Sequence, residues 1–77
     1  MKKIVIKIHG QVQGVGFRYA ATKKAAELGI HADPRNEPDG SVSVRAGGAE
    51  PALGKFIEWC RVGPPAAKIK KIEVEEN

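Results

Sequence analysis

The sequence predicts an α+β fold of order βαββαβ, in which a four-stranded antiparallel sheet carries two helices on one face. Three observations predict it. Apolar and polar residues alternate in segments that are typical of half-buried strands. Two other segments carry apolar residues at helical spacing, and an Asp-Gly pair marks a hairpin turn between the middle strands. With 77 residues, we expect one domain, 1–77, with a single core.

The first strand and the first helix flank a glycine-rich loop. Residues 3–9 place Ile4, Ile6 and Ile8 on one side of a strand. Residues 17–28 are rich in alanine and carry apolar residues at helical spacing, and Gly29 is typical of a helix end. Residues 10–16 connect the two elements.

A hairpin follows the first helix. Its first arm spans about 30–36, its turn lies at 37–40, and its second arm has Val42 and Val44 on one face. The pair Asp39-Gly40 is the strongest turn signal in the chain.

The second helix begins near Glu50, tolerates a proline in its first turn, and ends at the "GPP" of 63–65. Its apolar stripe consists of Leu53, Phe56, Ile57 and Cys60. The last segment, 66–76, alternates as a strand, but Ile69 is out of phase by one residue, which predicts a β-bulge or a bent start. The resulting order is that of the ferredoxin-like sandwich.

Composition restricts the partners. The net charge of +4 favours anionic ligands, but the lysines are spread along the chain and the end "EVEEN" is acidic. The first strand offers no aromatic residue of the kind that RNA-binding sheets expose, so we expect no nucleic-acid partner. Cys60 is the single cysteine, which excludes an internal disulfide and favours a reducing, cytoplasmic setting. The apolar start is interrupted at Lys7 and His9, unlike a signal peptide, and no membrane span is expected.

The glycine loop itself indicates an anion site. A strand, a loop with Gly10, Gly14 and Gly16, and a helix N-terminus gather backbone N–H groups and a positive dipole end around one volume. Arg18 adds a guanidinium suited to phosphate. The pattern matches neither the P-loop nor the dinucleotide fingerprint. The alternative is a loop that only turns the chain, with Phe17 in the core and Arg18 on the surface.

The stretch "GQVQGVGFR", 10–18, resembles the signature of acylphosphatases, small cytosolic enzymes that hydrolyse acyl phosphates to a carboxylate and inorganic phosphate. The resemblance implies a metal-independent enzyme without a cofactor, and inorganic phosphate as product and competitor. It implies that Arg18 and Asn36 are catalytic and that Asn36 orients the attacking water. The implied phosphate-binding loop consists of Gln11, Val12, Gln13, Gly14, Val15, Gly16, Phe17 and Arg18.

The second signature of that family is only half present. Arg35, Asn36 and the residues after them fit it, whereas Ala32, Asp33 and Pro34 depart from it. We expect Pro34 to lie in an edge strand or at a bulge, because it lacks a backbone donor, and Asp33 to add negative charge near the anion site. Acylphosphatases usually continue into a further short strand beyond "KKIEVEEN", and we expect the absence of that strand from this sequence to leave the first hairpin arm at the sheet edge.

Other functions compete with hydrolysis. A phosphate-binding module is the main alternative, in which the departure at Ala32 to Pro34 makes turnover poor. A similar domain begins certain hydrogenase-maturation carbamoyltransferases, so the fold also serves inside larger proteins. An RNA-binding sheet is the third possibility. His9 and His31 lack a third ligand at useful spacing and are expected to be surface or packing residues, and Cys60 is expected to be a core residue. We expect a cytoplasmic monomer with a small-molecule substrate.

Overall fold

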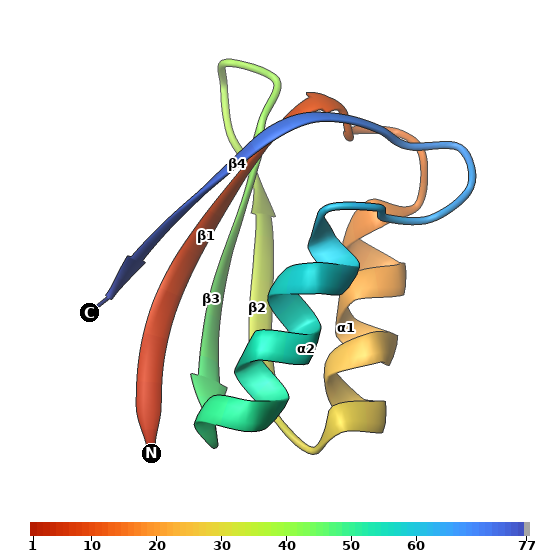
Figure 1. The fold of residues 1–77 in the computed structure, drawn as a ribbon. Coiled ribbons are helices and arrows are strands. Elements are labelled where there is room, and N and C mark those ends of the chain that lie inside the picture. The colour runs from red at the N-terminus through yellow and green to blue at the C-terminus, as the bar shows by residue number, and fades with distance from the viewer. Residues whose placement is uncertain (77) are drawn as a thin grey trace.

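The computed structural model describes residues 1–76 and has the predicted order βαββαβ. The sheet order is β2-β3-β1-β4, and every neighbouring pair is antiparallel. Both helices lie on one face of this sheet (Figure 1). The elements are β1 (Lys2–Gln11), α1 (Phe17–Leu28), β2 (His31–Asn36), β3 (Val42–Gly48), α2 (Glu50–Cys60) and β4 (Lys68–Glu76).

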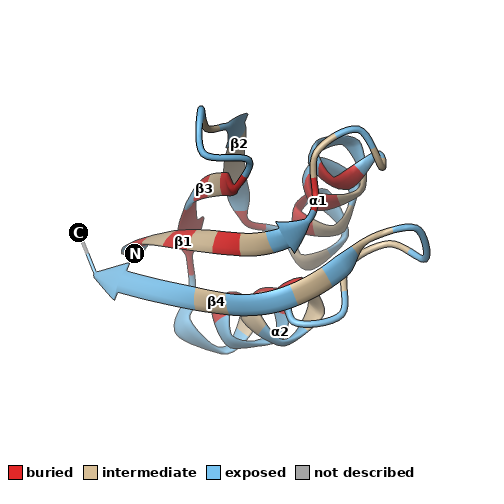
Figure 2. Ribbon diagram, turned by 90° about the horizontal axis from the view of Figure 1, so that it is seen from above, coloured by how far each residue is buried: buried red, intermediate tan, exposed pale blue. Residues whose placement is uncertain are grey.

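The core lies between the two central strands and the helices. The predicted alternation in β1 is confirmed: Ile4, Ile6 and Ile8 are buried, and they pair with three buried residues of β3. Figure 2 shows the same alternation of buried and less buried residues along β1. The helices close this core from one side, since α1 and α2 both present buried apolar residues to it. The buried residues from the helices are Phe17, Ala21, Ala25, Leu53, Phe56 and Cys60.

Trp59 links the two helices at their packed face. It is partly exposed, as its position beside the apolar stripe of α2 predicts. Its ring stacks on Phe56 with centroids 5.9 Å apart and contacts Phe17 of α1 at 5.4 Å. Such aromatic pairs stabilise beyond their buried area. The start of α1, where the glycine loop ends, is therefore fixed against α2.

The predicted irregularity in the last strand is a β-bulge at Lys70. His9 pairs with Lys71 and Gly10 pairs with Ile69, so Lys70 is an extra residue on β4. Gly10 has φ 131°, and a Cβ there would lie 2.1 Å from the backbone oxygen of Lys68. Only glycine fits at this position, because β4 approaches the β1 backbone too closely for a side chain.

The sheet has two edge strands, β2 and β4. Pro34 lies in β2 opposite Val44, which confirms the prediction that this proline belongs to an edge strand. Its missing N–H costs no ladder hydrogen bond on the open side of the strand. Neither helix within residues 1–76 is long and apolar enough to cross a membrane.

Candidate active site

The glycine loop and the end of β2 enclose one shallow hollow of about 170 Å³. Arg18, at the start of α1, and Asn36, the last residue of β2, both line it. The fold thus brings together the two side chains that the sequence singles out from separate motifs. The other lining residues are Val12, Gly14, Gly16, Phe17 and Tyr19.

The N-terminus of α1 opens into this hollow without a side-chain cap. Gly16 is the N-cap residue, with a left-handed φ of 78°, and its carbonyl accepts the first helical hydrogen bond from Ala20 N–H at 3.0 Å. The first N–H groups of an α-helix have no partner within the helix, and within residues 1–76 no side chain caps those of α1. Unpaired N–H groups at the positive end of a helix form an anion-binding site.

The conformation of the loop, and not its packing, requires glycine at two positions. Gly14 and Gly16 have φ values of 74° and 78°, and a Cβ at either position would meet no protein atom within 4 Å. A side chain there would strain the backbone. It would also project from the loop that lines the hollow.

Gln13 fastens the glycine loop to the hairpin turn that follows Asn36. Its side-chain nitrogen donates to the carbonyl oxygens of Glu37 at 2.8 Å and Ser41 at 2.9 Å. These two partly buried hydrogen bonds join the two halves of the site. The family resemblance implies that Gln13 belongs to the phosphate-binding loop. Because its side-chain amide is hydrogen-bonded to the turn, it would contact a ligand through its backbone N–H.

The turn is held by its own hydrogen bonds as well. Ser41 donates to the Asp39 carboxylate from its hydroxyl at 2.6 Å and from its backbone N–H at 2.9 Å. These bonds, with Lys7 nearby, lower the pKa of Asp39 to about 2. Glu37 accepts from the Gly40 backbone N–H at 3.1 Å. Asn36 therefore precedes a fixed turn.

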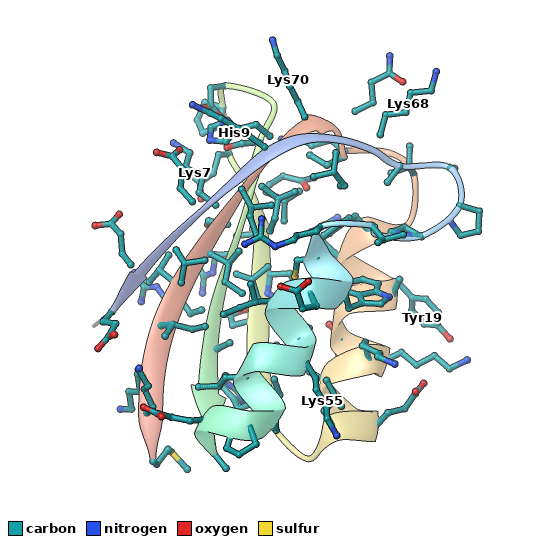
Figure 3. All side chains as sticks on the ribbon, in the orientation of Figure 1. Lys7, His9, Tyr19, Lys55, Lys68 and Lys70 are labelled. Atoms are coloured by element: carbon teal, nitrogen blue, oxygen red, sulfur yellow. The ribbon has the colours of Figure 1, made fainter. Side chains whose placement is uncertain are left out.

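Among the remaining residues of the predicted loop, Gln11 and Val15 do not line the hollow, whereas Phe17 does. Gln11 is still part of β1, opposite Lys68, and Val15 is partly buried against the core. Phe17 is buried in the core, and it also borders the hollow. Tyr19, which sequence analysis did not single out, stands at the rim with 77% of its surface exposed (Figure 3). The sequence signal that could have indicated Tyr19 as a site residue is its place directly after Arg18.

Asp33, which was expected to add negative charge near the anion site, does not line the hollow. It pairs with exposed Arg45, whereas Asn36 pairs with buried Val42, and alternation along β2 puts the two side chains on opposite faces of the sheet. The Asp33 carboxylate is bonded to Arg35 at 3.2 Å. Of the three residues that depart from the second signature, Asp33 is thus directed away from the face that carries Asn36.

The histidines and the cysteine are not part of the site. His9 is bonded to Glu73 at 2.7 Å, a contact that lowers the pKa of Glu73, and His31 is exposed. Cys60 is fully buried, and burial raises the pKa of its thiol to about 12, which excludes a nucleophilic role in the folded state. Within residues 1–76, no group of three His, Cys, Asp or Glu side chains is placed to hold a metal ion.

The chain is similar to proteins of known name over its whole length. A model of the acylphosphatase family matches residues 4–77. An acylphosphatase from Shewanella amazonensis is 43% identical over 77 residues, which cover 100% of this chain and 85% of that protein. The crystal structure of an acylphosphatase from Bacillus subtilis superposes with a TM-score of 0.96 at 38% identity, covering 100% of this chain and 86% of the other. HypF from T. kodakarensis also matches, with a TM-score of 0.86 and 35% identity, but only 10% of its chain is covered.

Proposed function

Because the chain belongs to the acylphosphatase family and is an acylphosphatase, a hydrolase of acid anhydrides, we propose that the hollow at the glycine loop is its active site. Arg18 and Asn36 are the catalytic side chains of this proposal. The observation that carries it is their meeting in one hollow with the uncapped end of α1.

The backbone N–H groups of the loop and the Arg18 guanidinium bind the phosphoryl group. Charge on the three equatorial oxygens of the transferred group has to be stabilised as the reaction proceeds. Fixed backbone donors do this without reorganising, and a guanidinium offers a matching fork of donors. Gly14, Gly16 and Phe17 line the hollow, and their backbone N–H groups are among the donors of this proposal.

Asn36 orients the attacking water. Its amide oxygen accepts a hydrogen bond from water but cannot take a proton near neutral pH. The water oxygen forms a bond to phosphorus while the bond from phosphorus to the acyl oxygen breaks, and the electron pair leaves with the carboxylate. The proton of the water passes to an oxygen of the substrate's own phosphate. A carboxylate is a good leaving group, so the residues above suffice for this step.

The two catalytic side chains of this proposal come from α1 and β2 of the same chain. A monomer is therefore the catalytic unit of this proposal. The substrate is a small acyl phosphate rather than a nucleic acid or a membrane component. The buried free thiol of Cys60 suits a reducing compartment, and we place the enzyme in the cytoplasm.

The test is hydrolysis of benzoyl phosphate by the wild type and by the Arg18→Ala and Asn36→Ala variants, without added metal. Losing one well-placed transition-state donor costs about a hundred- to a thousandfold in kcat, so we expect each variant to lose activity by that order. Arg45→Ala is the matched control, since Arg45 is an exposed arginine on the opposite face of the sheet. It keeps wild-type activity.

Phosphate binding separates hydrolysis from the alternative of a weak binding module. The proposal expects inorganic phosphate to compete with the substrate, and Arg18→Ala to abolish this competition. A wild type that binds phosphate through Arg18 but hydrolyses benzoyl phosphate no faster than buffer would support the binding module instead. Full activity in Asn36→Ala would remove Asn36 from the mechanism.

A further inference from the structure

The strand β4 is an exposed edge of the sheet. It pairs with β1 on one side, and no strand within residues 1–76 pairs with its other side. Figure 2 shows this strand in front of the helices and mostly exposed. An edge strand presents a row of unpaired backbone N–H and C=O groups that can pair with another strand.

The charges on β4 are divided between its two halves. The first half carries Lys68, Lys70 and Lys71, and the second half carries only acidic charges. Two of the glutamates are engaged within the chain: Glu73 with His9 at 2.7 Å and Glu76 with Lys2 at 3.1 Å. None of the ion pairs found within residues 1–76 includes Lys68, Lys71 or Glu75. Lys68 and Lys70 point away from the ribbon (Figure 3).

From this pattern we propose that β4 pairs with β4 of a second copy of this chain, antiparallel and about a twofold axis at Ile72. An antiparallel pair sets the basic half of each strand against the acidic half of the other. A twofold axis makes the interface self-complementary, so each contact occurs twice. The two four-stranded sheets become one continuous sheet.

The bulge at Lys70 makes the side chains match on both faces. If the second copy also skips Lys70, as β1 does, Lys71 lies opposite Glu73 of the second copy and Lys68 lies opposite Glu75. These four residues are on the sheet face away from the helices, because they pair with the β1 residues of that face or alternate with them. Opposite charges placed directly across two strands stabilise the pairing.

The other face of the same pairing is apolar. Ile72 meets its own copy, and Ile69 lies opposite Val74 of the second copy. All three are on the side of the helices, where Ile69 and Ile72 pack against the core. Val74 is 42% exposed, and it borders a hollow between the strand and α2 that Leu53 and Ile57 also line. Pairing would cover part of this apolar surface.

Neighbouring registers are opposed by like charges. Moving the axis to Glu73 sets Glu73 opposite Glu73 and keeps only Lys71 opposite Glu75 as an attractive pair. Moving it to Lys71 sets Lys71 opposite Lys71 and keeps only Lys68 opposite Glu73, whereas the axis at Ile72 gives both kinds of attractive pair and no like-charge pair. Like charges directly across a strand pair destabilise it. Charges on an edge strand usually prevent association. On β4 the basic and acidic halves instead favour one partner, a second β4, in one register.

Association of this kind would leave the active site intact. No residue of β4 lines the hollow that holds Arg18 and Asn36. The pairing buries few residues beyond the two strands, so the dimer is weaker than a standard interface would give and forms at high protein concentration. The monomer remains the catalytic unit in dilute assays.

The experiment is sedimentation velocity of the full chain over a concentration series up to the millimolar range, at low and at high salt. We expect reversible dimers that weaken as salt rises, because screening reduces the attraction of exposed charges. Lys68→Glu and Glu75→Lys each create like-charge pairs across the axis. For each variant alone, we expect a dimer dissociation constant at least about tenfold higher than that of the wild type. Mixed in equal amounts, the two variants restore opposite charges at all four positions and dimerise with each other.

Lys55→Glu is the matched control for charge. Lys55 is exposed on α2, away from β4 (Figure 3), so this variant changes net charge as Lys68→Glu does and dimerises like the wild type. All variants are expected to keep wild-type hydrolysis of benzoyl phosphate, which shows that they fold. A wild type that stays monomeric throughout, or a mixture of Lys68→Glu and Glu75→Lys that associates no better than either alone, would overturn the proposal.

Discussion

Gln13 has the most direct influence on the geometry of the site among the residues that do not line the hollow. Its amide donates to Glu37 and Ser41, so it sets the distance between the glycine loop and Asn36. A displacement of about 1 Å in a positioning residue can cost on the order of a hundredfold in rate. We expect Gln13→Ala to lower kcat for benzoyl phosphate by about ten- to a hundredfold, with a smaller change in KM.

The conservative variant separates positioning from folding. Gln13→Glu keeps the shape of the side chain but presents carboxylate oxygens to two carbonyl oxygens, so it loses both hydrogen bonds and repels them. It is expected to be at least as slow as Gln13→Ala. Circular dichroism checks that both variants are folded. Wild-type kcat in Gln13→Glu would contradict the positioning role.

At the scale of elements, the turn between β2 and β3 depends on the charge of Asp39. Its pKa is lowered from 3.8 to about 2, mainly because Ser41 donates two hydrogen bonds to the carboxylate. A lowered folded-state pKa means that the stabilisation is present above about pH 4 and is lost as the pH falls towards 2. We expect the free energy of unfolding to fall over this interval in the wild type and to fall less in Asp39→Asn. Urea denaturation at a series of pH values measures it.

Ser41→Ala provides the complementary measurement. It removes the hydroxyl donor but keeps the backbone donor, so the pKa of Asp39 is expected to rise partway towards its usual value. NMR titration of the Asp39 carboxyl group follows this directly. An unchanged pKa in Ser41→Ala would assign the lowering to Lys7 and the backbone N–H alone.

At the scale of the whole molecule, Cys60 reports on unfolding. Its side chain is 0% exposed in the core, and burial raises its pKa to about 12. The reactive thiolate is therefore scarce in the folded state, and reagents cannot reach it. We expect a disulfide reagent at pH 8 to modify Cys60 at a rate proportional to the unfolded fraction, and denaturant to accelerate the reaction in parallel with the loss of circular dichroism. Rapid modification of the native protein would contradict this burial.

The sequence predicted the elements well because each of them carries a local signal. Alternation in β1 and helical spacing in α2 reflect one shared core, and the phase shift at Ile69 indicated the bulge. Contacts between distant segments had no such signal. The bonds from Gln13 to the turn, and the direction of Asp33 away from the hollow, depend on how β2 lies beside the glycine loop. That Arg18 and Asn36 line one hollow was anticipated through the resemblance to a family, since the spacing of the two residues alone does not place them together.

The missing cap at Gly16 ties ligand binding to folding. Helices usually satisfy their first N–H groups with a serine, threonine, aspartate or asparagine side chain, which contributes about 1 kcal/mol. Here a glycine stands in that place, and a bound phosphate would perform the task that a capping side chain performs elsewhere. The substrate then completes a piece of secondary structure as well as reacting. A protein of this design becomes harder to melt as phosphate accumulates, so its thermal midpoint is itself a measure of how much of its own product surrounds it.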